Sequence, residues 1–268
     1  MKTYVINILP RQDRRWLMDS MLRENGFEIY TDDEGNDMSH RINKEGSEAP
    51  DLRVEWTTHW DYNKVGDEIT DEWMEENGFK LFDWEMDEGE ALSIDSAWAK
   101  WWSRPLTKGE IGCTLSHWAI WNEDEGPMTI LEDDAVFDSN MELQRDIAIE
   151  TLEVMDKEWD LLYLGRVAQT LPEKRVAKNL VKPNFSYCTY GYVLSKSGVE
   201  KIRKYNVHEG IIPADEFLCS TFIEHPRPDV KLKYPPTLKA YALNPHIVHQ
   251  REFEVVGSDT GLPKGAVK

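Results

Sequence analysis

Residues 107–134 read TKGEIGCTLSHWAIWNEDEGPMTILEDD, a helix pattern that leads through a turn into a short apolar strand ending in three acidic residues. The order Thr-Lys-Gly-Glu at 107–110 is a capping box, which predicts the start of a helix. Gly126 and Pro127 end that helix, and residues 128–131 then form a buried strand. The helix is expected to turn three apolar side chains to the core: Ile111, Leu115 and Trp118.

Helices and strands alternate on both sides of this stretch. Upstream, an apolar strand near residues 4–9 leads into a helix with one apolar face: Leu17, Met18, Met21 and Leu22. Downstream, a second amphipathic helix is predicted, with four residues as its core face: Leu143, Ile147, Thr151 and Val154. Apolar strands near 161–164 and 187–194 and a helix from Ser197 follow. This alternation predicts the α/β class, with a mostly parallel sheet flanked by helices.

The charge of the chain limits its partners. The sequence has 31 basic and 50 acidic residues, a formal net charge of -19. This charge repels nucleic acid and anionic membrane surfaces, so neither is an expected partner. A small anionic ligand would need a cation or a few well-placed basic side chains.

Cysteine content and hydropathy give the expected compartment. The 3 cysteines lack the CxxC spacing of a zinc knuckle and leave one without a disulfide partner, which favours a reducing environment. The apolar run at the start is too short for a signal peptide, and no stretch approaches 18 apolar residues. We therefore expect a cytoplasmic protein without a transmembrane segment.

Residues 31–104 are acidic and rich in tryptophan, with little regular periodicity. Around residues 54–60, Val, Trp, Thr and Trp alternate as in an amphipathic strand. Without repeats or linkers, we expect residues 1–268 to form a single domain with 31–104 as an insertion. Trp98, Trp101 and Trp102 are candidates for stacking on an acceptor, although such clusters more often serve packing.

Glu132, Asp133 and Asp134 follow the apolar strand directly. Ligands of α/β sheets bind at the carboxyl ends of strands, and three adjacent carboxylates there would repel unless a divalent cation neutralised them. Hard oxygen ligands indicate Mn²⁺ or Mg²⁺. The alternative is a strand that ends in a solvated acidic turn.

Other polar residues are weaker candidates. Arg11, Arg14 and Arg15 follow the first strand, where their guanidinium groups suit a diphosphate, or they are surface arginines. Ser116 and His117 lie on the helix from residue 107, either near a ligand or packed. Asp215 and Glu216 begin a helix, as catalytic carboxylates or as ordinary first-turn acids. His246 and His249 are metal-ligand or phosphate-contact candidates, or surface residues.

Six segments together resemble glycosyltransferase family 25, which contains lipooligosaccharide and procollagen galactosyltransferases. They are YVINILPRQDRR, RPLTKGEIGCTLSHWAIW, MTILEDDAVF, WDLLYLGR, YGYVLSKSGVEKI and PADEFLCSTFIEHP. The likeness covers residues 4–30 and 104 to about 261, and WDLLYLGR and PADEF are more similar to the procollagen branch. In residues 31–104 a D-G-K-like segment is usual, and only Asp33-Glu34-Gly35 is found.

The resemblance implies a GT-A type fold and an inverting transfer of galactose or glucose from a UDP-sugar, with Mn²⁺, to a hydroxyl of a saccharide or hydroxylysine-type acceptor. Residues 132–134 would be its D-x-D-like motif. Asp134 is then the first metal candidate, with Glu132 and His249 beside it, and Asp215 is the leading general base, with Glu216 and Glu110 as alternatives. The donor would contact a wider set of residues: Asn7, Arg11, Arg14, Ser116, His117, Glu132 and Asp133.

Two rival functions stay open on the sequence. A metal-dependent nucleotidyltransferase would also use carboxylates at a strand end, although no GxxxxGK[ST] loop is present. A catalytically inactive UDP-sugar-binding or scaffold protein would keep the fold without the reaction. The presence of Glu132, Asp134 and Asp215 argues against that second alternative.

Overall fold

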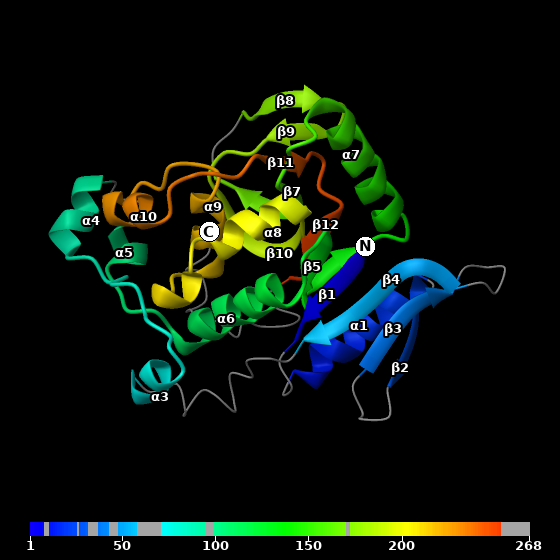
Figure 1. Cartoon of the computed structure of the whole chain (residues 1–268), viewed down its shortest axis with the longest axis horizontal. Coiled ribbons are helices and arrows are strands. Elements are labelled where there is room, and N and C mark those ends of the chain that lie inside the picture. The colour runs from blue at the N-terminus through cyan, green and yellow to red at the C-terminus, as the bar shows by residue number, and fades with distance from the viewer. Residues whose placement is uncertain are drawn as a thin grey trace.

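The computed structural model describes residues 1–7, 11–25, 27–31, 37–42, 48–57, 71–94, 99–169 and 172–252. A ten-stranded sheet in the order β2-β3-β4-β1-β5-β10-β7-β11-β9-β8 runs through the molecule, and β12 and β6 form a second, two-stranded sheet (Figure 1). The strands are β1 (Lys2–Ile6), β2 (Phe27–Thr31), β3 (Asp37–Ile42), β4 (Glu48–Thr57), β5 (Met128–Glu132), β6 (Ala135–Phe137), β7 (Leu161–Ala168), β8 (Lys174–Ala177), β9 (Leu180–Lys182), β10 (Ser186–Leu194), β11 (Ala240–Leu243) and β12 (Val248–Gln250).

Helices cover both faces of the large sheet. One face packs against α1 and α7, and the other against α6, α8, α9 and α10. The helices are α1 (Gln12–Glu24), α3 (Asp71–Glu76), α4 (Glu88–Ile94), α5 (Ala99–Trp102), α6 (Lys108–Glu123), α7 (Met141–Met155), α8 (Lys196–Arg203), α9 (Ala214–Ser220) and α10 (Pro228–Lys233), with a 3₁₀ turn η1 (Val207–Glu209). This arrangement confirms the α/β class.

Burial on both faces explains why the strands read as continuous apolar runs. Along β1, Tyr4 belongs to one core cluster and Val5 to the other; Ile130 and Leu131 divide in the same way along β5. Successive side chains of a strand point to opposite faces, so both must be apolar when both faces are covered.

The sheet is mixed, with a parallel centre. β1 pairs in parallel with β4 on one side and with β5 on the other, and β11 is parallel to β7. β10 is antiparallel to both of its neighbours, β5 and β7. The predicted parallel character therefore holds around β1, where the carboxyl ends of β4, β1 and β5 meet at one edge.

Helix α6 begins where the capping box predicts. The Thr107 hydroxyl accepts a hydrogen bond from the Glu110 backbone N–H at 3.2 Å, and the Glu110 carboxylate accepts one from the Thr107 N–H at 2.9 Å. Ile111 and Leu115 are buried and Trp118 packs beside them. The expected core face of this helix is confirmed.

Helix α7 faces the sheet with a different side from the predicted one. Leu143, Ile147 and Val154 are exposed at 63%, 53% and 87%, so their assignment to the core was wrong. The buried face carries instead Met141, Arg145, Ala148 and Leu152. Because Arg145 is charged, this stripe does not read as a core face in the sequence. In the structure the Arg145 guanidinium donates hydrogen bonds to the Thr129 hydroxyl and to Asp146.

The segment 31–104 contributes to the main body of the fold. The alternation around residue 54 does form a strand: β4 lies beside β1, while residues 58–60 lie outside the described ranges. Further along, Phe79, Trp84 and Trp102 are buried in the core clusters. Tryptophans of this segment therefore contribute to the packing of the core.

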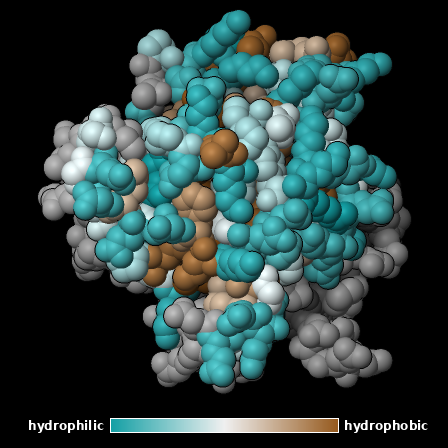
Figure 2. Space-filling model, turned by 60° about the vertical axis from the view of Figure 1, so that its left-hand side comes forward, coloured by the Kyte–Doolittle hydropathy of each residue, from teal (hydrophilic) through white to brown (hydrophobic). Residues whose placement is uncertain are grey.

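The surface agrees with the acidic composition. Figure 2 shows one face that is mostly hydrophilic, with hydrophobic side chains in small groups near its centre and at its top edge. Across the described ranges, no helix combines the length and the apolar character needed to cross a bilayer.

Candidate active site

The candidate site lies at the edge where β1 and β5 end side by side. Ile6 is opposite Glu132 in the parallel register, which places Asn7 next to Asp133. The Asn7 amide donates to Asp133 Oδ2 at 2.7 Å, and the Arg14 guanidinium donates to Asp133 Oδ1 at 2.9 Å. Both Arg14 and Asp133 are buried, so these two hydrogen bonds hold the Asp133 side chain in one position.

Glu132 points away from Asp133, toward α6 and β10. Its Oε1 atom accepts a hydrogen bond from the Thr189 hydroxyl at 2.5 Å and contacts His117 Nε2 at 3.3 Å. His117 Nδ1 in turn contacts the Tyr192 hydroxyl at 2.8 Å. Burial raises the pKa of Glu132, but the hydrogen bond and charge of His117 outweigh it and the net pKa is lowered.

Asp134 takes a third direction and keeps one oxygen without a partner. Oδ2 accepts from the Gln250 amide at 3.0 Å, whereas Oδ1 is buried and has no hydrogen-bond partner in the part of the chain that the structure describes. Burial, and then the charge of Glu132, raise the pKa of Asp134 to about 7. The three carboxylates therefore do not converge on one point, contrary to the simplest expectation, because consecutive side chains at a strand end diverge.

Two glycines allow β12 to reach Asp134. Val248 crosses directly over β7 and β10, where a Cβ on Gly165 would overlap its carbonyl oxygen and one on Gly191 would lie 2.8 Å from its Cγ1. β12 then pairs with β6, which starts just after Asp134. The close approach thus explains glycine in the WDLLYLGR and YGYVL segments.

His249 is not brought to the carboxylates. Neighbouring residues of a strand point to opposite faces, and the Gln250 side chain occupies the face that carries Asp134. His249 lies instead beside His246, with 6.4 Å between the ring centroids. The structure therefore does not support His249 as a ligand of a cation at Asp134.

Asp215 lies at the start of α9 against an irregular part of β10. Between Tyr187 and Gly191 the register of β10 shifts, and Cys188 has a φ of 68°. This bulge turns the Cys188 backbone N–H toward Asp215 Oδ2, at 3.2 Å. Burial, and then the charge of Glu216, raise the pKa of Asp215 to about 7.

Gln250 and Cys188 connect Asp134 with Asp215. The Gln250 amide donates to Asp134 Oδ2, the Cys188 thiol lies 4.0 Å from Gln250 Oε1, and the Cys188 backbone N–H donates to Asp215 Oδ2. Burial raises the pKa of Cys113, and the charges of Glu132, Asp215 and Asp134 raise it further. The same three carboxylates raise the pKa of Cys188 after burial. The leading metal candidates and the leading base candidate are therefore neighbours in the fold, although they are far apart in sequence.

Glu216 and Glu110 serve the fold, and burial argues against their predicted catalytic roles. Glu216 is fully buried, with Oε2 at 2.8 Å from His225 Nε2. Arg104 holds both oxygens of Glu110, at 2.8 and 2.7 Å, within the capping box. Both oxygens of each carboxylate therefore already have hydrogen-bond partners within the fold.

Three residues that were predicted to bind the sugar donor have other contacts in the fold. The Ser116 hydroxyl is buried and donates to the Gly112 carbonyl at 2.8 Å within α6. His117 is fully buried behind Glu132. Arg11 forms a two-pronged ion pair with Asp13, at 3.0 and 2.8 Å. The contacts of these three side chains therefore do not support their predicted roles in binding the sugar donor.

The tryptophans at 98, 101 and 102 do not share one environment. Trp102 is fully buried and its indole N–H donates to Glu216 at 3.4 Å, so it is a core residue. Trp101 is partly buried, with Arg104 4.5 Å above its ring. Trp98 lies outside the described residues. Of the two described tryptophans, Trp101 keeps its candidacy for an acceptor contact.

Thr189, Tyr192 and Gln250 also contact residues of the site, but the sequence did not indicate them. None belongs to a recognisable catalytic motif, and each reaches the site from an element distant in sequence. The one available signal was Gly191 inside an apolar strand, since a strand glycine often marks a bulge or a close backbone approach.

Replacing Arg14 by methionine is expected to lower the free energy of unfolding by about 3 kcal/mol, because Asp133 would stay buried without its cation. Urea denaturation in the absence of UDP measures this loss. Arg11→Met is the matched control, since its partner Asp13 is exposed and the pair should contribute less than about 1 kcal/mol. Equal losses would contradict a special role for Arg14 in the fold.

Replacing Glu216 by alanine is expected to destabilise the domain by about 3 kcal/mol, since His225 and Trp102 would lose a buried partner. Glu216→Gln keeps the shape but only one accepting oxygen for the two N–H donors, Trp102 Nε1 and His225 Nε2. It should therefore lose less stability than the alanine variant and keep sugar transfer within a few fold of wild type. Thermal unfolding and a transfer assay on the same preparations check both. A folded glutamine variant without transfer would make Glu216 a catalytic group.

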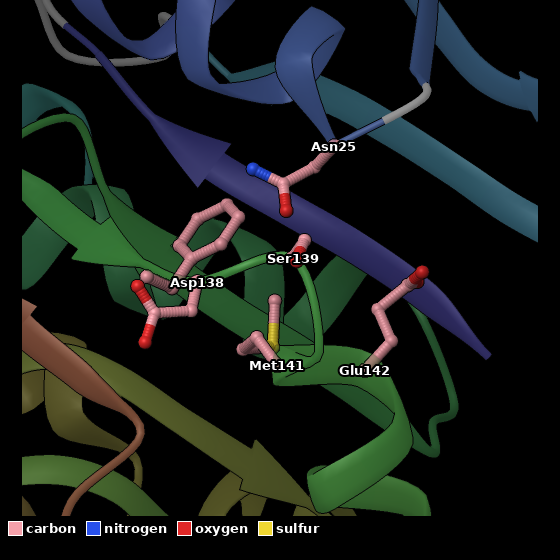
Figure 3. A pocket seen from close by; sticks show the side chains of 6 residues that line it. Asn25, Asp138, Ser139, Met141 and Glu142 are labelled. Atoms are coloured by element: carbon pink, nitrogen blue, oxygen red, sulfur yellow. The ribbon is translucent and has the colours of Figure 1, made fainter.

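A shallow hollow lies at the other end of β6, between the end of α1 and the start of α7 (Figure 3). Asn25, Asp138, Ser139, Met141 and Glu142 line it. It is separated from Asp134 by the length of β6, and we do not assign it to the candidate site.

Family comparison agrees with this geometry. The family described as "Glycosyltransferase family 25 (LPS biosynthesis protein)" matches residues 1–218, more than half of the chain. The chain belongs to glycosyltransferase family 25. The matched range includes Asn7, Glu132, Asp134 and Asp215.

Several relatives of this family 25 chain carry names. It is 34% identical over 159 residues to procollagen galactosyltransferase 1 of Danio rerio, covering 56% of this chain and 26% of that protein. It is 34% identical over 160 residues to human procollagen galactosyltransferase 2, with 56% and 26% covered. It is also 37% identical over 151 residues to human "Inactive glycosyltransferase 25 family member 3", with 53% and 25% covered. The chain thus spans about a quarter of the length of these relatives.

Proposed function

We propose that this family 25 domain transfers a hexose from a UDP-sugar to a hydroxyl group of its acceptor, with inversion and with a divalent cation. The observation that carries the proposal is the placement of Asp134, with a buried unpartnered oxygen, in the same region as Asp215. A cation-accepting oxygen and a proton-accepting carboxylate are the two groups that such a transfer requires.

Asp134 would hold the cation, whereas Glu132 is directed away from it, toward His117 and Thr189. The unpartnered Oδ1 of Asp134 is a hard oxygen that suits Mn²⁺ or Mg²⁺. When bound, the cation would neutralise charge that develops on the departing diphosphate. Asn7, Arg14 and Asp133 would support this edge by holding the ends of β1 and β5 together.

Asp215 would accept the proton of the attacking hydroxyl group. Its two backbone hydrogen bonds, from Cys188 and Glu216, fix the direction of the carboxylate. An inverting transfer places the acceptor hydroxyl on the face of the sugar opposite to the departing diphosphate, where a carboxylate within hydrogen-bond reach can act as general base. Nearby negative charge also favours an oxocarbenium-like transition state.

The names of the relatives support galactose as the transferred sugar and a procollagen-type acceptor, in which we propose hydroxylysine as the accepting residue. The family description also fits a lipopolysaccharide-type saccharide. Incubation with UDP-galactose or UDP-glucose and Mn²⁺, against hydroxylysine peptides and lipooligosaccharide cores, followed by mass spectrometry, tests donor and acceptor together. Transfer to neither class would contradict the proposal.

A catalytically inactive UDP-sugar-binding protein is the second candidate, because some relatives are named as inactive. A UDP-release assay separates the two, with Asp215→Asn as the control for background hydrolysis. Equal release by wild type and this variant would favour the inactive candidate. The family match leaves the nucleotidyltransferase alternative without support.

A further inference from the structure

Three unlike side chains meet where α6 passes the end of β5. Cys113, His117 and Glu132 each place one ligand atom within 4.8 Å of the other two. Cys113 and His117 are four residues apart on α6 and therefore share one face of the helix. We propose that these three residues bind a thiophilic divalent cation such as Zn²⁺, at a site separate from the hard-cation site assigned to Asp134.

The geometry suits a tetrahedral ion with one open position. Bond lengths of about 2.0 to 2.3 Å to nitrogen, oxygen and sulfur require ligand atoms about 3.3 to 3.8 Å apart. His117 Nε2 and Glu132 Oε1 are already 3.3 Å apart. The Cys113 sulfur lies within 4.8 Å of both atoms, so an inward shift of this one side chain would complete the spacing.

The buried ligand has an outer partner that orients it. The Tyr192 hydroxyl lies 2.8 Å from His117 Nδ1 and accepts a hydrogen bond from the Trp121 indole N–H at 3.0 Å. A metal-bound histidine usually donates its other ring N–H to such a partner, and a hydroxyl oxygen has lone pairs for both donors. The ring is thus held with Nε2 directed at Glu132.

The local charge favours a cation. Glu132 is itself a member of the cluster, and the Asp133 and Asp134 carboxylates follow it directly in the chain. This negative charge would attract a cation, which in turn would stabilise the thiolate that coordinates it. Sulfur and imidazole ligands select Zn²⁺ over the hard cations Mg²⁺ and Mn²⁺.

Two of the three ligands are reachable from solvent. Cys113 and Glu132 are partly exposed, whereas His117 is fully buried. The Thr189 hydroxyl, which donates to Glu132, would be the contact that the ion replaces.

Co²⁺ titration of the metal-free full chain tests the proposal through a sulfur-to-cobalt charge-transfer absorption band, a readout that does not depend on sugar transfer. We expect one equivalent of Co²⁺ to produce the band, and Zn²⁺ to abolish it by displacement. Cys113→Ser should remove the band. Its Zn²⁺ affinity should fall by more than the 10- to 100-fold typical for loss of an outer partner.

Cys188→Ser and Cys219→Ser are the matched controls, since neither thiol belongs to the cluster, and both should keep the band. Tyr192→Phe should keep it with about 10- to 100-fold weaker affinity. Thermal unfolding of each variant shows that the fold persists. A wild-type chain without the band, or a band that persists in Cys113→Ser, would overturn the proposal.

Discussion

Replacing Asp134 by alanine is expected to abolish cation-dependent binding of UDP and to lower sugar transfer by at least about 10³-fold. Asp134 is the carboxylate whose buried Oδ1 has no partner among the described residues, so it is the group that a cation would satisfy. A metal that stabilises the departing diphosphate contributes several kcal/mol, and each 1.4 kcal/mol corresponds to a factor of ten in rate.

Calorimetric titration of UDP, with Mn²⁺ and with EDTA, measures the effect on binding. Asp138→Ala is the matched control, because Asp138 follows shortly in the chain but is exposed at the hollow beyond β6. Wild type should lose UDP affinity in EDTA, and the Asp134 variant should show the same weak affinity in both solutions. Equal wild-type affinity with and without EDTA would remove the cation from the proposal.

Replacing Asp215 by asparagine is expected to lower transfer by about 10²- to 10⁴-fold, the usual contribution of a general base, while UDP affinity changes little. The amide keeps the shape of the side chain but has negligible basicity. Steady-state kinetics and UDP titration on the same protein separate kcat from binding. Transfer within a few fold of wild type would place the base elsewhere, and loss of UDP binding would assign Asp215 to the donor site.

The pH dependence gives a second test of Asp215. A base with a pKa of about 7 is ionised only above that value, so transfer should rise about tenfold per pH unit below 7 and level off above it. With saturating Mn²⁺, which would keep Asp134 ionised, this limb should vanish in Asp215→Asn. A wild-type profile that is flat from pH 5 to 8 would contradict the assignment.

The stability of the fold should change with pH in the sense opposite to that of the transfer rate. The pKa of Asp215 is raised from 3.8 to about 7 in the folded state, so the fold holds this proton more tightly than the unfolded chain does. Its contribution to stability is present below about pH 4 and is lost as pH rises through about 7. Asp215→Asn removes this loss and should gain stability relative to wild type between pH 5 and pH 8, as urea denaturation at both values would show.

Much of the fold could be predicted from local patterns. The capping box at Thr107, the apolar strand before Glu132 and the strand around Val54 all appear where the sequence places them, because each depends on neighbours within a few residues. Helix α7 shows the limit of this approach. Its most apolar stripe, with Leu143 and Ile147, faces outward, and the stripe that includes Arg145 packs inside with that charge paired.

The sequence by itself determined the α/β class, the family and the position of the acidic motif at a strand end, because local periodicity, caps and motif order encode them. Only the tertiary structure decided what each acidic residue does. It buried Glu216 with His225, held Asp133 with Arg14, and left an oxygen of Asp134 without a described partner. These outcomes depend on residues more than a hundred positions apart or on burial, and no local pattern in the sequence records which distant side chains will meet.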